Sequence, residues 1–416
     1  MSFNDTTPST VPADVVVEGS SDLETQPPRR RWPWVLGGIV VTLAGMAIVF
    51  AAIVDASTIG KDLYILSPGS ATNTAESVNV QGAETYAPEG EIAFTTVSIR
   101  RDISVWEWLI ARYDDSSELV PAELIDGTRS TEEAREVTRF QMSVSQDTAT
   151  LVALDFLGYD IVPEVEGAFV LQLVPESPAE AQLRLGDLIT EVNGAPIRSS
   201  DDLGDAIRAA EPGDIVAITL SRGDVADGGD GSDPDAETVE LEVELADHPD
   251  VEGAGFLGVR IETPIRADAP FDVSIDVGRV RGPSAGLAFS LAIVDVLSEG
   301  ELTGGARVAT TGTISANGII GAVGGVPQKI AAAEREGIDV FLVPPSEYND
   351  AISVAGGDIE IRCVQTFDDA VITLAEFGGN GIAVAEQFGA PPPEQSPNPI
   401  DPNDGFETCA EVVGAS

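Results

Sequence analysis

The fold of this chain is decided at residues 281–297, whose sequence is RGPSAGLAFSLAIVDVL. The run from Leu287 to Leu297 is almost wholly apolar, which predicts a buried helix, and Ser284 stands just before it. The free N–H groups and the positive dipole end of such a helix favour an oxyanion that develops beside the serine. Pro283 has no N–H to contribute. The alternative interpretation of Ser284 is an ordinary helix N-cap.

A lysine provides the complementary group. Lysine occurs only at Lys61 and Lys329, and Lys329 lies in the sequence GGVPQKIAAAEREGI at 324–338, where Pro327 is expected to open a helix. A desolvated ammonium can lose its proton, whereas a guanidinium stays protonated, so a lysine can serve as a base where an arginine cannot. Apolar neighbours and a helix N-terminus both push the pKa of Lys329 downward. Lys61 is most simply an interfacial anchor beside a membrane.

Several motifs in order resemble the proteolytic domain of Lon proteases. They are GPSAG at 282–286, TGTI at 311–314, and GAVGGVPQK at 321–329, followed by AAA at 331–333, GI at 337–338 and Pro344. The resemblance implies a Lon-type α/β proteolytic domain at 250–380, with Ser284 as nucleophile and Lys329 as general base. It also implies supporting roles for Thr311, Gly282 and Ala285, the Thr311 hydroxyl holding the lysine amine.

The segment 158–248 resembles a PDZ domain of the bacterial protease type, through SPAEAQLRLGDLITEVNG at 177–194. The resemblance implies a β-sandwich or barrel-like fold with helices. It also implies a groove between a strand and the helix at 203–210 that takes an extended peptide by strand addition. Residues 156–159 are the candidate carboxylate-binding loop. The alternative is a packing module that binds no peptide.

An uncharged apolar run extends from Val35 to Val54, separated from Arg29–Arg31 by Trp32-Pro33-Trp34. At 1.5 Å per residue it covers about 30 Å, the thickness of the hydrocarbon core of a bilayer. We therefore expect a transmembrane anchor at 29–55, a disordered cytoplasmic tail at 1–28 and an extracytoplasmic remainder of about 360 residues. The alternative is a cleaved signal peptide, although the apolar regions of signal peptides are shorter.

The remaining segments complete an α+β multidomain chain. Residues 56–157 are expected to form strands and helices that pack on the proteolytic domain, and 381–416 a flexible acidic, proline-rich tail. From Arg29 to about Phe377, the chain is similar to the membrane-anchored, PDZ-containing Lon-like proteases of bacteria.

Composition excludes several other classes. With 70 acidic and 22 basic residues the net charge is −48, which excludes nucleic-acid partners. The single histidine, His248, excludes two-histidine metalloprotease motifs and is interpreted as a turn residue. The aspartate-rich insert at 222–237 is interpreted as a solvated loop, with a calcium site as the alternative. No metal or cofactor is expected. Cys363 and Cys409, both predicted outside the membrane, are expected to pair and close the C-terminal tail onto the proteolytic domain.

The chain contains no Gly-x-x-x-x-Gly-Lys-Ser/Thr motif, so no ATP is expected to take part. The sequence as a whole predicts an ATP-independent, membrane-tethered serine endopeptidase that cleaves extracytoplasmic polypeptides by a Ser284–Lys329 dyad, with PDZ-assisted recruitment of substrate. A homo-oligomer is one option for its assembly. The alternative is a catalytically silent PDZ scaffold or adaptor at the membrane.

Overall fold

The computed structural model describes residues 41–43, 45–46, 63–114, 116–126, 131–159, 161, 163–165, 167–223, 236–249, 251, 253–395 and 409–415. The chain divides into two units, 1–55 and 56–416. In the first unit, residues 41–43 and 45–46 are helical. Within the described ranges, no helix is both long enough and apolar enough to cross a membrane. Most of the predicted anchor at 29–55, and the whole predicted tail at 1–28, lie outside the described residues.

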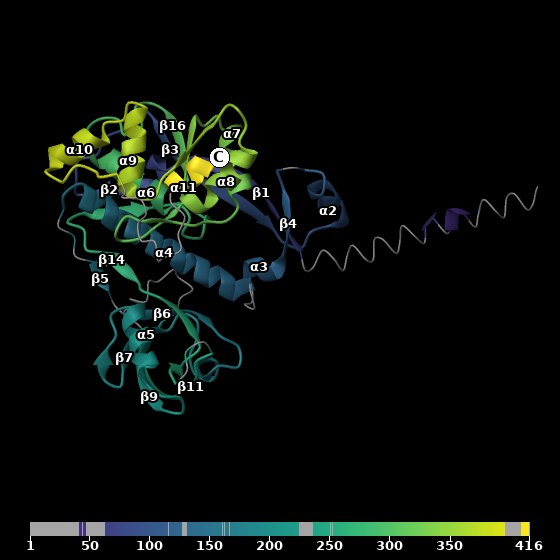
Figure 1. Cartoon of the computed structure of the whole chain (residues 1–416), viewed down its shortest axis with the longest axis vertical. Helices are drawn as coiled ribbons and strands as arrows, with labels where there is room; N and C mark the ends of the chain where they lie inside the picture. The colour runs from purple at the N-terminus through teal and green to yellow at the C-terminus, as the bar shows by residue number, and fades with distance from the viewer. Residues whose placement is uncertain are drawn as a thin grey trace, which may run out of the picture. The chain divides into compact units, whose positions relative to one another are not determined.

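The proteolytic region is built on a six-stranded sheet with the order β20-β19-β16-β3-β1-β4 (Figure 1). The strands are β1 (Leu63–Asn73), β3 (Glu91–Arg100), β4 (Glu118–Pro121), β16 (Arg307–Thr310), β19 (Val340–Val343) and β20 (Glu360–Cys363). The central strand β16 is parallel to both β3 and β19. The segment at 56–157, which we expected to pack on the proteolytic domain, therefore supplies half of its sheet.

Helices cover both faces of this sheet. On one face α4 (Thr131–Phe156) and α6 (Gly286–Leu297) form a core with Ile92 and Phe94 of β3. On the other face α7 (Val326–Arg335) packs against Ala93 and Ala309. Successive residues of a strand point to opposite faces, so β3 contributes to both cores. All residues of α6 are buried, as its uniformly apolar sequence predicts.

Shorter elements complete the proteolytic region. They are η1 (Ala75–Ser77), β2 (Val78–Gln81), α2 (Val105–Ala111), α3 (Ala122–Asp126), β15 (Asp272–Ile275), β17 (Thr313–Ile314), β18 (Ile320–Gly321), α8 (Pro345–Val354), α9 (Phe367–Glu376), α10 (Gly381–Phe388) and α11 (Cys409–Ala415). β17 and β18 pair as a short antiparallel ribbon.

The PDZ region has its own sheet, with the order β10-β9-β7-β6-β13, and β8 paired with β7. Its elements are β6 (Ala168–Leu173), η2 (Pro178–Ala181), β7 (Leu188–Val192), β8 (Ala195–Pro196), α5 (Ser200–Arg208), β9 (Ile215–Arg222), β10 (Glu237–Glu244), β11 (Ala246–Asp247), β12 (Gly255–Phe256) and β13 (Val259–Glu262). Leu203 and Ile207 of α5 fill its core. The aspartate-rich insert, with Asp224, Asp227, Asp230, Asp233 and Asp235, lies outside the described residues.

The first part of the proteolytic domain expected at 250–380 belongs to the PDZ region instead. Residues 255–262 form β12 and β13, and β13 pairs with β6 of the PDZ sheet. Gly258 separates the two strands with φ of 82°, and a Cβ at this position would lie 2.1 Å from the Cβ of Ser177. A glycine is therefore required where the chain turns into the PDZ sheet.

The PDZ region is inserted between two parts of the proteolytic region. The chain enters it through β5 (Pro163–Val165) and leaves it through β14 (Ile265–Ala267), and these two strands pair antiparallel (Figure 1). The ring of Phe140 in α4 also stacks on that of Phe169 in β6, with a centroid distance of 3.5 Å and an angle of 6°. The two regions thus share a ribbon and an apolar contact.

The C-terminal segment differs from the flexible tail that we expected at 381–416. Residues 381–388 form α10, which packs on α9 with Val384 and Ala385 fully buried in the core. Apolar residues four positions apart give this helix one face that can pack on the core. The proline-rich and acidic composition begins only after the helix. The predicted Cys363–Cys409 disulfide is confirmed, with a Cα–Cα distance of 5.6 Å. It joins α11 to the end of β20.

Candidate active site

Ser284 lies in a tight loop between β15 and α6. The loop is fixed at its start by the Gly282 N–H, which donates to the Thr138 carbonyl at 3.1 Å, and Gly282 has φ of 92°. Ser145 of α4 donates its hydroxyl to the Pro283 carbonyl at 3.1 Å. The Ser284 carbonyl accepts the Gly312 N–H at 3.0 Å. The serine is half-buried, and within the described part of the chain its hydroxyl forms no hydrogen bond.

The N-terminus of α6 offers fewer free N–H groups than the helix alone would predict. The Gly286 N–H donates to the Pro283 carbonyl, and the Leu287 N–H donates to the Gly312 carbonyl, both at 3.3 Å. Among the described residues, the N–H groups of Ser284 and Ala285 have no partner. These two groups are the candidates for stabilising a developing oxyanion. Ala285, one of the expected supporting residues, is buried with 4% of its surface exposed.

Lys329 is buried in the first turns of α7, with 3% of its surface exposed. Burial lowers the pKa of its amine to about 8, against an ordinary value of 10.5. The Nζ atom donates to the Thr311 hydroxyl at 2.8 Å. The same hydroxyl donates to the Ser284 carbonyl at 3.3 Å. Thr311 therefore joins the lysine amine to the main chain of the serine, and the contact that the resemblance implied is present.

The start of α7 places this lysine. The helix begins at Val326, one residue before the Pro327 that we expected to open it, and Gly325 precedes it with φ of 70°. The Lys329 N–H closes the first helical turn on the Gly325 carbonyl at 3.0 Å. Ile330 and Ala333 pack into the core below. The amphipathic pattern around Lys329 thus fixes the face on which its side chain lies.

Glu347 is a neighbour of Lys329 that sequence reasoning missed. It lies in the first turn of α8 and is 8% exposed. Its carboxylate accepts the Val323 N–H at 3.1 Å and the Ser346 hydroxyl at 2.6 Å. Its negative charge raises the pKa of Lys329 and so opposes the larger effect of burial. An acidic residue after Pro344-Pro345 marks a helix start in the sequence, but nothing local connects it to the lysine.

A cavity of about 500 Å³ adjoins the serine loop. Pro283, the residue before Ser284, is part of its wall. The remaining walls come from α4, the segment around β14, and β17–β18: Gln141, Val144, Ser145, Thr148, Glu262, Thr263, Ile265, Thr313, Ile314, Ser315, Ala316, Ile319 and Gly321. Its position beside the candidate nucleophile makes it a candidate substrate pocket.

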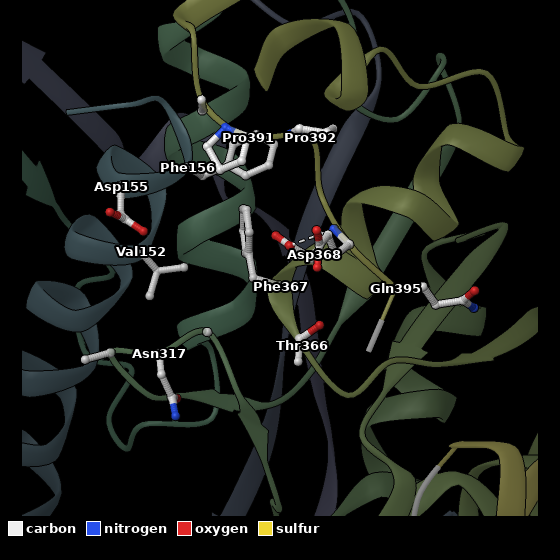
Figure 2. Close-up of a pocket in the computed structure, with 14 residues that line it drawn as sticks. Val152, Asp155, Phe156, Asn317, Thr366, Phe367, Asp368, Pro391, Pro392 and Gln395 are labelled. Carbon is white, nitrogen blue, oxygen red and sulfur yellow. Dashed lines mark hydrogen bonds between the residues drawn. The ribbon is translucent and has the colours of Figure 1, made fainter. Parts of the chain in front are cut away.

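A second cavity, of about 580 Å³, lies at the junction of α4 and α9 (Figure 2). Figure 2 shows Phe156, Phe367 and the prolines Pro391 and Pro392 around it, with Asp368 accepting a hydrogen bond. That bond comes from the Glu394 N–H at 3.0 Å and fastens the proline-rich segment to the start of α9. None of Ser284, Lys329 and Thr311 lines this cavity, so its larger size does not make it the active site.

The resemblance to PDZ domains implied a peptide groove beside α5, and β13 is an edge strand of the PDZ sheet. Before β13, the carbonyls of Leu257 and Gly258 accept the N–H groups of Ala179 and Val174, at 3.0 and 2.8 Å. Among the described residues, the N–H groups of Leu257 and Gly258 have no partner. Two such N–H groups beside a free strand edge suit a peptide carboxylate. The candidate loop at 156–159 instead lies in the proteolytic core, with Phe156 and Leu157 buried there.

Other residues singled out from the sequence lie apart from this site. The ring of His248 contacts that of Phe256 at 5.5 Å, in the PDZ region. Lys61 lies outside the described residues. In the part of the chain that the structure describes, no group of three or more histidine, cysteine or acidic side chains is placed to hold a metal.

Comparisons with known proteins identify both regions. Residues 155–245 match the family model of the PDZ domain, and residues 272–375 match that of the Lon protease (S16) C-terminal proteolytic domain. The Lon protease of Haemophilus influenzae is 30% identical over 132 residues, which cover 31% of this chain and 16% of that protein. The Lon protease of Clostridioides difficile is 43% identical over 63 residues, which cover 15% and 8%. The chain thus spans less than a fifth of the length of these relatives.

Among solved structures, the PDZ domain of an SdrC-like protein from Listeria monocytogenes is 27% identical, covers 23% of this chain and 87% of that one, and has a TM-score of 0.19. The two family models show that the chain carries a PDZ domain and a Lon-type proteolytic domain.

Proposed function

We propose that this protein is an ATP-independent endopeptidase, tethered to a membrane, that cleaves extracytoplasmic polypeptides with Ser284 as nucleophile and Lys329 as general base. The observation that carries the proposal is the buried Lys329 amine, whose pKa is lowered to about 8 and which Thr311 joins to the Ser284 main chain. A neutral amine near physiological pH can accept a proton from a serine hydroxyl, which a surface lysine cannot do.

The proposed chemistry follows from this arrangement. The neutral amine takes the Ser284 proton while Oγ forms a bond to the scissile carbonyl carbon, and the carbonyl oxygen becomes an oxyanion. The N–H groups of Ser284 and Ala285 stabilise that charge. The resulting ammonium returns its proton to the leaving amine, and the C–N bond breaks to give an acyl-enzyme. Water, deprotonated by the same amine, then attacks the ester and releases the serine.

The decisive experiment measures cleavage of unfolded casein by the full chain. The wild type is expected to cut casein at the same rate with and without ATP, and Ser284→Ala is expected to remove the activity. Ser353→Ala, which changes an exposed serine of α8, is the matched control and should behave as the wild type. Full activity of Ser284→Ala would exclude the serine. An inactive wild type would instead favour the second candidate, a silent PDZ scaffold.

We propose that the PDZ groove recruits extended polypeptides. The free edge of β13 and the unpartnered N–H groups of Leu257 and Gly258 support this role. Because β5 and β14 pair antiparallel, residues 167–262 can be replaced by a short turn that joins the two strands. Because the deletion also removes Glu262 from the wall of the cavity, the short substrate is a peptide without lysine or arginine. The shortened protein should show a raised KM for long polypeptides and an unchanged kcat for that short peptide. Equal losses on both substrates would indicate a structural role.

We propose that the chain is anchored with its N-terminus in the cytoplasm. The arginines at 29–31 before the apolar run support this topology, and the Cys363–Cys409 disulfide fits an oxidising compartment. Alkaline phosphatase fused after Gly60 should be active in cells, because this enzyme needs export to fold. An inactive but stable fusion would indicate the opposite topology, with the N-terminus outside the cytoplasm.

A further inference from the structure

The cavity beside Ser284 contains a single charged residue. Glu262, the last residue of β13, lines it together with side chains that are all uncharged. Within the described residues, its carboxylate forms no hydrogen bond and no ion pair. Burial alone raises the pKa of this carboxyl group. A partly desolvated carboxylate without a partner is destabilising, and a bound cation would remove that penalty.

The backbone on both sides of Glu262 is fixed. Glu262 pairs with Phe169 across the PDZ sheet. The next residue, Thr263, accepts the Ser200 N–H at 2.9 Å with its hydroxyl oxygen and lies 2.9 Å from the Ser200 hydroxyl. Ile265 then begins β14. The carboxylate is therefore held at the cavity by a strand, and a substrate does not need to order a loop to reach it.

We propose that Glu262 determines specificity and that the substrate residue seated in this cavity, close to the bond cleaved at Ser284, is a lysine or an arginine. The walls suit such a side chain along its whole length. Val144, Ile265 and Ile314 can cover the aliphatic stem, and the Gln141 and Thr148 side chains can accept N–H groups that Glu262 leaves unpaired. Pro283 is the wall nearest in sequence to the nucleophile, which places the occupant next to the scissile bond.

This inference rests on the proposed function, and the test separates the two. The full chain is incubated with synthetic peptides of equal length in which one residue, either arginine, glutamine or norleucine, is moved through each position. Mass spectrometry of the products locates the cuts. Arginine at one fixed distance from the cut should raise kcat/KM about 10- to 100-fold over glutamine, the range of a hydrogen-bonded charge pair.

Substitutions of Glu262 assign the effect to this residue. Glu262→Gln, which keeps the shape, should reduce the ratio of kcat/KM for the arginine peptide to that for the norleucine peptide to about 1. Glu262→Lys should shift the preference to glutamate at the same position. The matched control Glu240→Gln removes an exposed carboxylate of β10 and should retain the wild-type preference. Circular dichroism and the Tm of each variant establish that it is folded.

Two results would overturn the inference. One is cleavage that depends on Ser284 but shows no enrichment of basic residues at any position. The other is an arginine preference that survives in Glu262→Gln. In both cases the proposed endopeptidase would stand, because Ser284→Ala still removes the cuts. Loss of all cleavage by the wild type would overturn both proposals.

Discussion

The two regions of the molecule treat a buried charge in opposite ways. In the PDZ region, the Asp187 side chain is 1% exposed and pairs with Arg222 through two hydrogen bonds of 2.7 and 2.6 Å. It also accepts the Arg184 N–H at 2.8 Å. In the proteolytic region, Lys329 is similarly buried, but its hydrogen bond goes to the uncharged Thr311, and it forms no ion pair with any described residue.

We interpret the Asp187–Arg222 pair as one that stabilises the fold, and the Lys329 amine as a group that serves the proposed chemistry. Removing one partner of a buried pair leaves the other unpaired and is strongly destabilising. A buried amine without a counter-ion destabilises the fold while it is present, and such residues are concentrated at functional sites. Asp187 and Lys329 can therefore be tested against each other by the sign of their effects on stability and activity.

The largest expected effect is on the activity of Lys329 variants. Lys329→Ala and Lys329→Arg should each lower kcat/KM on a peptide substrate by about 10²–10⁴-fold, because one has no base and the other a permanently protonated group. Steady-state kinetics on folded variants measures this loss. If size alone mattered, arginine would be the milder replacement, so near-normal activity of Lys329→Arg would exclude lysine as the base.

The next effect is on the stability of the PDZ region. Arg222→Met should lower the free energy of unfolding by about 3–5 kcal/mol, because it leaves the Asp187 carboxylate buried and unpaired. Urea denaturation followed by circular dichroism gives this value. Arg208→Met is the control, because Arg208 pairs with Asp205 at an exposed position, and its effect should stay within about 1 kcal/mol. Equal changes in the free energy of unfolding for the two substitutions would contradict the distinction between a buried and an exposed ion pair.

Lys329→Met should change stability in the opposite direction. The pKa of the amine falls from 10.5 to about 8 on folding, which corresponds to a loss of about 3 kcal/mol of native-state stability at pH 7, where the amine is protonated in both states. Methionine removes this loss and fills similar space, so the variant should be more stable than the wild type. Because the pKa is lower in the native state, the unfolded chain binds more protons between about pH 8 and 10.5, and wild-type stability should rise over this range. The advantage of the methionine variant in stability should therefore shrink as the pH rises. A constant difference across this range would contradict a buried amine.

The smallest effect is a displacement of the pH profile. In the proposed mechanism the neutral amine is the active form, so kcat/KM should rise with pH through an apparent pKa of about 8. Glu347→Gln removes a negative charge that raises the pKa of Lys329, so the same rise should move to lower pH, by a fraction of a unit. The exposed Glu360→Gln on β20 is the control and should leave the profile in place. A shift to higher pH would contradict the proposed electrostatics.

The sequence predicted the parts of the site that depend on local structure. Ser284 before an apolar helix and Lys329 in the first turns of another are consequences of patterns a few residues long, and both helices are present. Glu347 was missed because its approach to Lys329 depends on how α7 and α8 pack. The assignment of β13 to the proteolytic domain was wrong for a similar reason. The strand pairs with β6, which lies far away along the chain, and no local pattern predicts that pairing. The roles of Gly282 and Ala285 stay predictions.

The interrupted sheet of the proteolytic region also has a consequence for the order of synthesis. Its central strand β16 joins β3, made before the PDZ region, to β19, which ends at Val343. The PDZ core, from β6 to β13, is complete once the ribosome has passed residue 262. The nascent chain can thus fold its PDZ region first, before Lys329 and the strands β16, β19 and β20 have been synthesised. Under the proposed mechanism, a growing polypeptide therefore has no peptidase activity until Lys329 has been synthesised and α7 has folded.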